Sequence, residues 1–144
     1  MTSPEPHPDA DADLVVERTT HDRLLDHARQ GAPEEICGVL GGRDGRVTTA
    51  EPVPNVASDP ERRYELDPAA TIDAIDRVEA SASTEHLGFY HSHPRGPPDP
   101  SATDEAEATW PGYVYCIVSV PDASLSAWRW TGERFERLSV GIVP

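Results

Sequence analysis

Residues 86–104 read HLGFYHSHPRGPPDPSATD, and this stretch determines how the fold brings the candidate functional residues together. His86 to His91 is largely apolar and predicts a β-strand. Pro94 to Pro100 holds four prolines and a glycine, which exclude regular structure and predict a stiff loop. Ser101 then opens a Ser-x-x-Asp-Glu sequence followed by alanine, which is typical of a capped helix start. The stretch is therefore expected to run strand, rigid loop and helix in succession.

Outward from this stretch, short strands alternate with helical segments. Residues 113–120 are nearly continuously apolar and predict a central strand that is covered on both faces. Thr20 and Asp67 are candidate N-caps of two longer helices. Residues 125–130 and 134–143 predict a closing hairpin. The expected fold is α+β, close to α/β: a mixed sheet of about six strands flanked by two longer helices and one short helix.

The length of 144 residues suits one domain with a single core. Residues 1–13 are acidic and proline-rich with almost nothing to bury, so we expect a disordered tail there and a folded domain over 14–144. No apolar stretch indicates a signal peptide or a membrane span, and we expect a soluble, cytoplasmic protein. Cys37 and Cys116 lie far apart in apolar runs, the pattern of small buried residues rather than of a disulfide.

The net charge of the chain limits the kinds of partner that it can bind. The net charge is -14, with 26 acidic residues against 12 basic ones, and all 12 are arginine. Nucleic acid and anionic membranes are excluded as main partners because both require a basic patch. High acidity without lysine is expected of a protein from a salt-loaded cytoplasm. An ordinary acidic protein, or one that escapes conjugation at lysine, would share this composition.

The candidate chemistry lies at His91, His93 and Asp104. Histidines at positions i and i+2 near a strand end project to the same side of the backbone, so both can reach one ion. Asp104 falls on the first turn of the following helix, which the proline loop directs back toward the strand end. Two imidazoles and one carboxylate leave a tetrahedral position open, as in catalytic zinc sites. The alternative is a chance His-x-His beside a plain helix cap.

These residues resemble a known motif. His91-Ser-His93 and Ser101-Ala-Thr-Asp104, separated by the seven residues 94–100, are similar to the JAMM (MPN+) motif of zinc metalloproteases. Upstream, residues 33–42 (PEEICGVLGG) resemble the glutamate strand of that family, in which an acid stands two residues before Cys-Gly. That places the family glutamate on Glu35. Glu34 is the alternative, because neighbouring residues on a strand point to opposite sides.

The resemblance covers the chain from about residue 14 to the end and implies a JAMM/MPN core of the cytidine-deaminase-like kind. It implies that His91, His93 and Asp104 bind Zn²⁺ and that Glu35 takes a proton from the attacking water and passes it to the leaving amine. It also implies that Ser101 donates a hydrogen bond to the oxyanion. Ser101 has a second expected role as the cap of the helix that carries Asp104.

The motif positions are all filled, which argues against the metal-free scaffold members of the family. The short connection after Asp104 resembles the small archaeal members, whose haloarchaeal versions remove ubiquitin-like small archaeal modifier proteins from lysine conjugates and from linear fusions. The resemblance thus implies a modifier protein and its lysine conjugates as partners. A second group within the family releases cysteine from the C-terminus of a ubiquitin-like sulfur carrier, and a non-enzymatic interaction module is a third possibility. The loop at 55–63, with Arg62 and Arg63, is a candidate for gripping the modifier tail.

Overall fold

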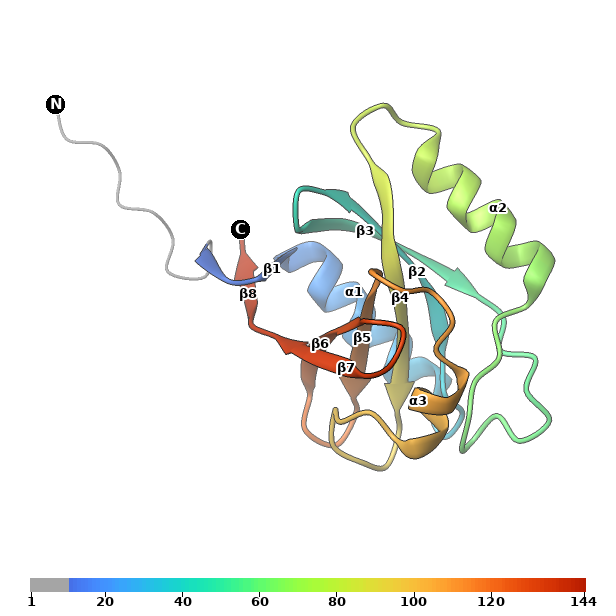
Figure 1. The fold of residues 1–144 in the computed structure, drawn as a ribbon. Helices are drawn as coiled ribbons and strands as arrows, with labels where there is room; N and C mark the ends of the chain where they lie inside the picture. Colours follow the sequence, from blue (N-terminus) through green and yellow to red (C-terminus); the bar gives the residue numbers. More distant parts are fainter. Residues whose placement is uncertain (1–10) are drawn as a thin grey trace, which may run out of the picture.

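The structure is a computed structural model that describes residues 11–144; of the disordered tail expected at residues 1–13, the first ten residues lie outside this range. Eight strands and three helices follow one another along the chain (Figure 1): β1 (Leu14–Glu17), α1 (Arg18–Gly31), β2 (Cys37–Arg43), β3 (Arg46–Val53), α2 (Pro68–Glu79), β4 (Glu85–His93), α3 (Ala102–Glu107), β5 (Val114–Ser119), β6 (Ser124–Trp130), β7 (Phe135–Leu138) and β8 (Val140–Val143).

The strands form one mixed sheet in the order β7-β6-β5-β4-β2-β3-β1-β8. β4 pairs antiparallel with β2 and parallel with β5, so the strand that carries both histidines is interior. All six residues of β5 are buried, as its continuous apolar sequence predicted. The mixed sheet with two longer helices and one short helix confirms the α+β class.

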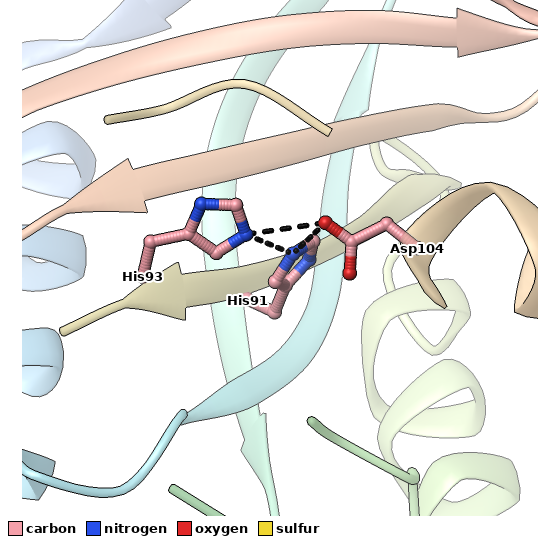
Figure 2. A group of neighbouring side chains, drawn as sticks. All are labelled: His91, His93 and Asp104. Carbon is pink, nitrogen blue, oxygen red and sulfur yellow. Dashed lines mark hydrogen bonds and ion pairs between the residues drawn. The ribbon is translucent and has the colours of Figure 1, made fainter. Parts of the chain in front are cut away.

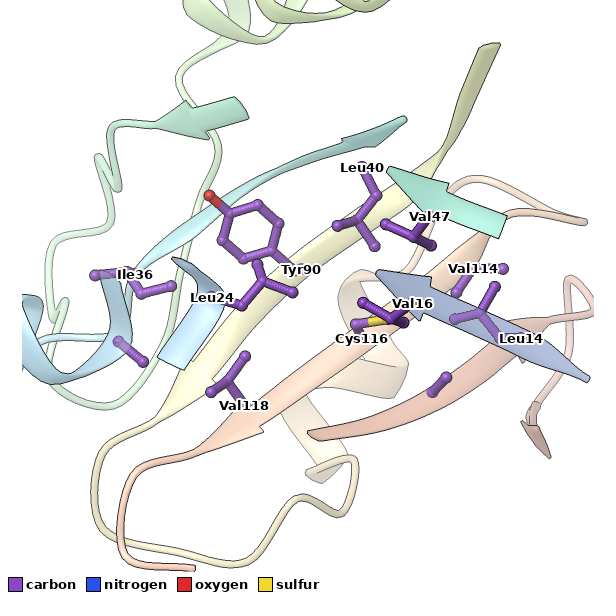
Figure 3. Close-up of a cluster of buried hydrophobic side chains, with 12 residues drawn as sticks. Leu14, Val16, Leu24, Ile36, Leu40, Val47, Tyr90, Val114, Cys116 and Val118 are labelled. Carbon is purple, nitrogen blue, oxygen red and sulfur yellow. The ribbon is translucent and has the colours of Figure 1, made fainter. Parts of the chain in front are cut away.

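The alternation of side chains along β4 assigns the two longer helices to opposite faces of the sheet. Tyr90 belongs to an apolar cluster that includes Leu24 and Ala28 of α1 (Figure 3), with further members from β1, β2, β3, β5 and β6. Phe89 points the other way, into a cluster that includes Ala74 and Val78 of α2. The face that carries Phe89 also carries His91 and His93, because all three lie two residues apart on one strand.

The number of strands was underestimated: there are eight rather than about six. The difference lies mainly at the C-terminus, where the segment 134–143 was expected to form one arm of a hairpin. Only β7 pairs with β6, whereas β8 pairs with β1 at the opposite edge of the sheet. The chain divides at Ser139, whose backbone N–H donates to Asp13 Oδ2 while its hydroxyl accepts from the Asp13 N–H. Side-chain hydrogen bonds of this kind leave no trace in apolar periodicity.

One of the two expected helix caps was wrong and the other is confirmed. Thr20 does not cap α1, which already begins at Arg18; its hydroxyl instead donates to the Thr48 carbonyl of β3. Ala74 and Val78 form the buried stripe of α2, whereas Ile72 is 61% exposed. Asp67 caps α2 as predicted, accepting a hydrogen bond from the Ala70 N–H at 2.9 Å.

The remaining local features of the fold are small. The Asp44–Gly45 turn joins β2 to β3, with both residues at positive φ. An isolated bridge joins Asn55 to Leu66 at the two ends of the loop that precedes α2. Cys37 and Cys116 are free and buried, which confirms their expected role as small core residues. Within residues 11–144, no helix is long and apolar enough to cross a membrane.

Candidate metal centre

The structure brings the three predicted ligands together although they come from two elements. His91 and His93 lie at the C-terminal end of β4, and Asp104 lies in the first turn of α3. His91 is 2% exposed and Asp104 is 7% exposed. The proline loop between them carries the chain from the end of the strand back to the helix. Within residues 11–144, these three residues are the one group of His, Cys, Asp or Glu side chains arranged to hold a metal ion.

Three atoms of this group form a nearly equilateral triangle (Figure 2). His91 Nε2 lies 3.2 Å from His93 Nε2 and 3.2 Å from Asp104 Oδ2, and His93 Nε2 lies 3.1 Å from the same oxygen. A tetrahedral zinc site with bonds of about 2.0–2.1 Å places its ligand atoms about 3.3 Å apart. The triangle therefore has the dimensions of one face of such a tetrahedron, and its fourth corner is left without a protein ligand.

The tautomer of His93 supports the same conclusion. Its Nδ1 lies 2.8 Å from the carbonyl oxygen of Pro97. A carbonyl can only accept, so Nδ1 carries the proton, and in the neutral ring Nε2 presents a lone pair to the triangle. That lone pair faces the carboxylate of Asp104, which is also an acceptor. Two acceptors at this distance need a proton or a cation between them: a proton on Nε2 makes the hydrogen bond to Asp104 in the metal-free protein, and a divalent cation fits the same donor set.

Burial and hydrogen bonds shift the pKa values of the three groups in different directions. Burial lowers the pKa of His91 and keeps its ring neutral, the form that binds metal. Burial also acts to lower the pKa of His93, but hydrogen bonds to Asp104 and Pro97 outweigh it and leave the pKa raised. Burial would raise the pKa of Asp104, yet hydrogen bonds from both histidines and from the Ser101 N–H hold it well below its usual range.

Glu35 is buried near this group, whereas Glu34 is exposed. Glu35 is 6% exposed and lies just before the first residue of β2. Burial is the main cause that raises the pKa of Glu35 to about 7; the nearby His93 lowers it and Asp104 raises it. Its Oε1 is buried and has no hydrogen-bond partner within residues 11–144. A carboxyl group with such a pKa can exchange a proton near neutral pH.

Ser101 caps α3, the structural role expected of it. Its hydroxyl oxygen accepts from the Asp104 N–H at 3.0 Å, while Asp104 Oδ2 accepts from the Ser101 N–H at 2.9 Å. This reciprocal pair is a capping box, and it fixes the carboxylate that completes the triangle. The hydroxyl proton of Ser101 has no acceptor within residues 11–144 and is free to donate to a substrate.

Two neighbours of His91 make contacts that the sequence does not predict. The ring of Tyr64 stacks on the His91 imidazole, with centroids 4.3 Å apart and planes 19° from parallel. The buried hydroxyl of Ser92 accepts a hydrogen bond from the Ile36 N–H at 2.9 Å. No periodicity or spacing signals either contact.

A groove of about 560 Å³ adjoins the metal centre along the face of β4. Phe89 and Tyr115 lie at its base, and Tyr64 belongs both to the groove and to the stack on His91. Arg63 and Glu107 form an ion pair between the 55–66 loop and α3 at this groove. Arg62, the other arginine noted in this loop, is exposed and pairs with Asp59 at 3.7 Å.

A mixed sheet with this two-histidine, one-aspartate triangle opposite a buried glutamate defines a metal-dependent hydrolase of the JAMM type. A family model agrees: the prokaryotic homologs of the JAB domain match residues 17–131. The chain belongs to this family.

Named relatives support the assignment. The chain is 52% identical to a desampylase of Haloferax volcanii over 90% of its own length and 96% of the relative. It is 33% identical to a CysO-cysteine peptidase of Mycobacterium tuberculosis, over 76% of its own length and 75% of that protein. A solution structure of a Desulfitobacterium hafniense protein superposes with a TM-score of 0.81 at 28% identity, covering 90% of this chain and 92% of the other.

Proposed function

We propose that the chain is a zinc-dependent isopeptidase that removes ubiquitin-like small modifier proteins from lysine side chains, and acts on linear fusions of the same modifiers, in the cytoplasm. His91, His93 and Asp104 hold the metal. The observation that carries this proposal is the triangle of Nε2, Nε2 and Oδ2 atoms at 3.1–3.2 Å, with the buried Glu35 carboxyl group, whose Oε1 has no hydrogen-bond partner within residues 11–144, near it. The 52% identity to a desampylase supports the choice of substrate class.

The reaction replaces the C–N bond of the isopeptide with a C–O bond to water. A zinc ion bound there would polarise the carbonyl group and lower the pKa of a coordinated water from about 15.7 toward about 7. Glu35 accepts a proton from the attacking water and delivers it to the lysine nitrogen as the C–N bond breaks. Ser101 donates a hydrogen bond from its hydroxyl group to the substrate oxygen as negative charge develops on that oxygen. The products are a modifier carboxylate and a free lysine amine.

The groove beside Tyr64 suits an extended peptide tail. Its polar edge, at Arg63 and Glu107, offers partners to main-chain or terminal groups, and its aromatic base offers apolar contact. A tail that ends in small residues can lie in such a channel and bring its last carbonyl to the metal. Arg62, exposed in the same loop and paired with Asp59 at 3.7 Å, can exchange this partner for a carboxylate of an acidic modifier.

The test is cleavage of a modifier–lysine isopeptide conjugate in multimolar salt, with and without a zinc chelator, beside a Glu35→Ala variant. We expect the chelator to abolish cleavage, added zinc to restore it in the wild type, and Glu35→Ala to stay inactive with zinc. Activity that survives chelation would refute the metal mechanism. Activity that survives in Glu35→Ala would assign proton transfer to Glu34 or to solvent.

Release of cysteine from a sulfur-carrier protein is the second candidate, because the chain is also 33% identical to a CysO-cysteine peptidase. A carrier that ends in an added C-terminal cysteine belongs in the same assay. Cleavage of that substrate alone would move the function to sulfur metabolism, with the same metal, Glu35 and Ser101 roles. An interaction module without activity predicts that neither substrate is cut and that metal removal affects stability alone.

A further inference from the structure

One asparagine joins the segment of Glu35 to the loop of Tyr64. Asn55 Nδ2 donates to the Glu35 carbonyl at 2.9 Å and to the Arg63 carbonyl at 3.1 Å. Its Oδ1 accepts from the backbone N–H groups of Ala57 and Glu65, both at 3.0 Å. The partners fix the orientation of the amide, because the two carbonyls need donors and the two N–H groups need an acceptor. All four hydrogen-bonding positions of the side chain are used.

The backbone of Glu35 depends on this loop because it lies outside the strand pairing, which begins at Cys37. Its N–H donates to the Pro60 carbonyl at 2.7 Å, and its carbonyl accepts from Asn55. Both main-chain groups of Glu35 therefore bond to the segment 55–66. On the other side, Ser92 bonds to both main-chain groups of Ile36. The carboxyl group has no hydrogen bond of its own at Oε1, so its position follows from these backbone contacts.

The same side chain also sets the position of Tyr64. Asn55 bonds to the residue before it, through the Arg63 carbonyl, and to the residue after it, through the Glu65 N–H. Tyr64 is held between these two contacts with its ring against His91. The Asn55 amide thus holds both the backbone of Glu35 and the loop of Tyr64, whose ring packs on the predicted metal ligand His91.

We propose that Asn55 is a positioning residue: it holds the main chain of Glu35, and with it the carboxyl group, at the distance from the metal triangle that proton transfer requires. The catalytic part of this inference rests on the proposed function. Removing a group that positions a reacting residue lowers activity by about 10- to 100-fold. A displacement of about 1 Å at a reacting group has an effect of similar size.

The test is the nearly isosteric Asn55→Asp variant of the full chain. It keeps an oxygen toward Ala57 and Glu65 but places a second oxygen against the Glu35 and Arg63 carbonyls. With the conjugate substrate and added zinc, we expect kcat to fall about 10- to 100-fold while KM stays within about threefold. Zinc affinity, measured by competition with a chromogenic chelator, should fall less than kcat, because Asn55 contacts no ligand and reaches His91 only through the ring of Tyr64. In the metal-free protein, hydrogen exchange at the Glu35 amide should accelerate as its bond to Pro60 opens.

Asp67→Ala is the matched control, because it removes one capping bond at the end of the same loop and touches neither Glu35 nor Tyr64. It should keep wild-type kcat and wild-type exchange at Glu35. In a Glu35→Gln background, Asn55→Asp should cause no further loss of kcat, since the two act through one group. Asn55→Ala, which introduces no repulsive oxygen, serves if the aspartate variant does not fold, with a smaller loss of kcat expected.

Wild-type kcat and Glu35 exchange in both Asn55 variants would overturn the inference, and so would equal losses in Asp67→Ala. Additive losses in the Glu35→Gln background would also overturn it. If the wild-type protein cleaves neither substrate, the proposed function fails. The exchange at Glu35 then still decides whether Asn55 holds that segment, because this measurement needs neither metal nor substrate.

Discussion

Two buried regions of this molecule are held in different ways. The cluster under α1, which contains Leu24, Leu40 and Tyr90, is apolar and makes non-directional contacts that many neighbours share (Figure 3). The cluster at the end of β4 is polar, and each of its groups depends on a few specific polar contacts (Figure 2). The first region therefore determines whether the chain folds, and the second what the folded chain does. Single substitutions should separate the two effects.

The largest expected effect is on metal binding and activity in Asp104→Asn. This change keeps an oxygen that can accept from the Ser101 N–H but removes the negative charge that two histidines share. We expect metal affinity to fall more than about 100-fold and cleavage at least about 1,000-fold, with folding of the metal-free protein retained. Zinc titration and circular dichroism measure the two properties. Glu34→Gln, at an exposed acid, is the control and should match the wild type.

Leu24→Ala should lower the stability of the fold and leave metal binding and activity unchanged. Leu24 is 2% exposed in the apolar cluster, and truncating a buried leucine costs about 2–5 kcal/mol of unfolding free energy. Urea denaturation measures this loss. At a temperature where the variant is folded, kcat/KM and zinc affinity should equal those of the wild type, because the residue lies on the face of the sheet opposite the histidines. A loss of activity without a loss of stability would show that the two regions are not separable.

The same division explains what the sequence could and could not predict. The core strands and the two longer helices follow from apolar patterning, and the three ligands follow from i, i+2 geometry at a strand end together with a capped acid. Long-range polar contacts have no such pattern. The bonds from Asn55 to Glu35, from Ser92 to Ile36 and from Asp13 to Ser139 each join residues that are distant in sequence, so their consequences, including the division into β7 and β8, had to come from the structure.

Glu35→Gln tests how much the buried carboxyl group of Glu35, which has no hydrogen bond at Oε1 within residues 11–144, lowers the free energy of unfolding when it is ionised. Burial raises the pKa of Glu35 from 4.5 to about 7 in the folded state. A raised folded pKa means that the stabilising contribution is complete below pH 4.5 and is lost as the pH rises through 7. Relative to the wild type, the metal-free glutamine variant should therefore gain about 2–3 kcal/mol of unfolding free energy between pH 4.5 and pH 8, and little beyond.

The measurement is urea denaturation of chelator-treated protein from pH 4.5 to pH 8.5. Glu34→Gln should give a curve parallel to the wild type, because that side chain is exposed. Zinc should reduce the difference between Glu35→Gln and the wild type, since a nearby cation favours the ionised carboxylate. Parallel curves for Glu35→Gln and the wild type in the metal-free state would mean that the acid is solvated rather than buried.

The smallest expected effects on stability are those of substitutions at Ser101. Its hydroxyl group has a structural role, as the cap of α3, and a proposed chemical role, as a hydrogen-bond donor to the substrate. Ser101→Ala removes the cap of α3 and the free hydroxyl donor together, so we expect a loss of about 1 kcal/mol in stability and about 100-fold in kcat. Ser101→Asp restores a capping oxygen but no donor, and its stability should recover while kcat stays low. Ser101→Thr offers both groups and should recover both.

Thermal denaturation and steady-state kinetics at saturating zinc measure the Ser101 series. If kcat follows stability across alanine, aspartate and threonine, the serine acts only by fixing the helix that carries Asp104. If kcat recovers with threonine alone, the hydroxyl proton acts on the substrate, and the capping bond serves to aim it. The second outcome is the one we expect, because the capping bond uses the oxygen of Ser101 as an acceptor and leaves its proton without a partner within residues 11–144.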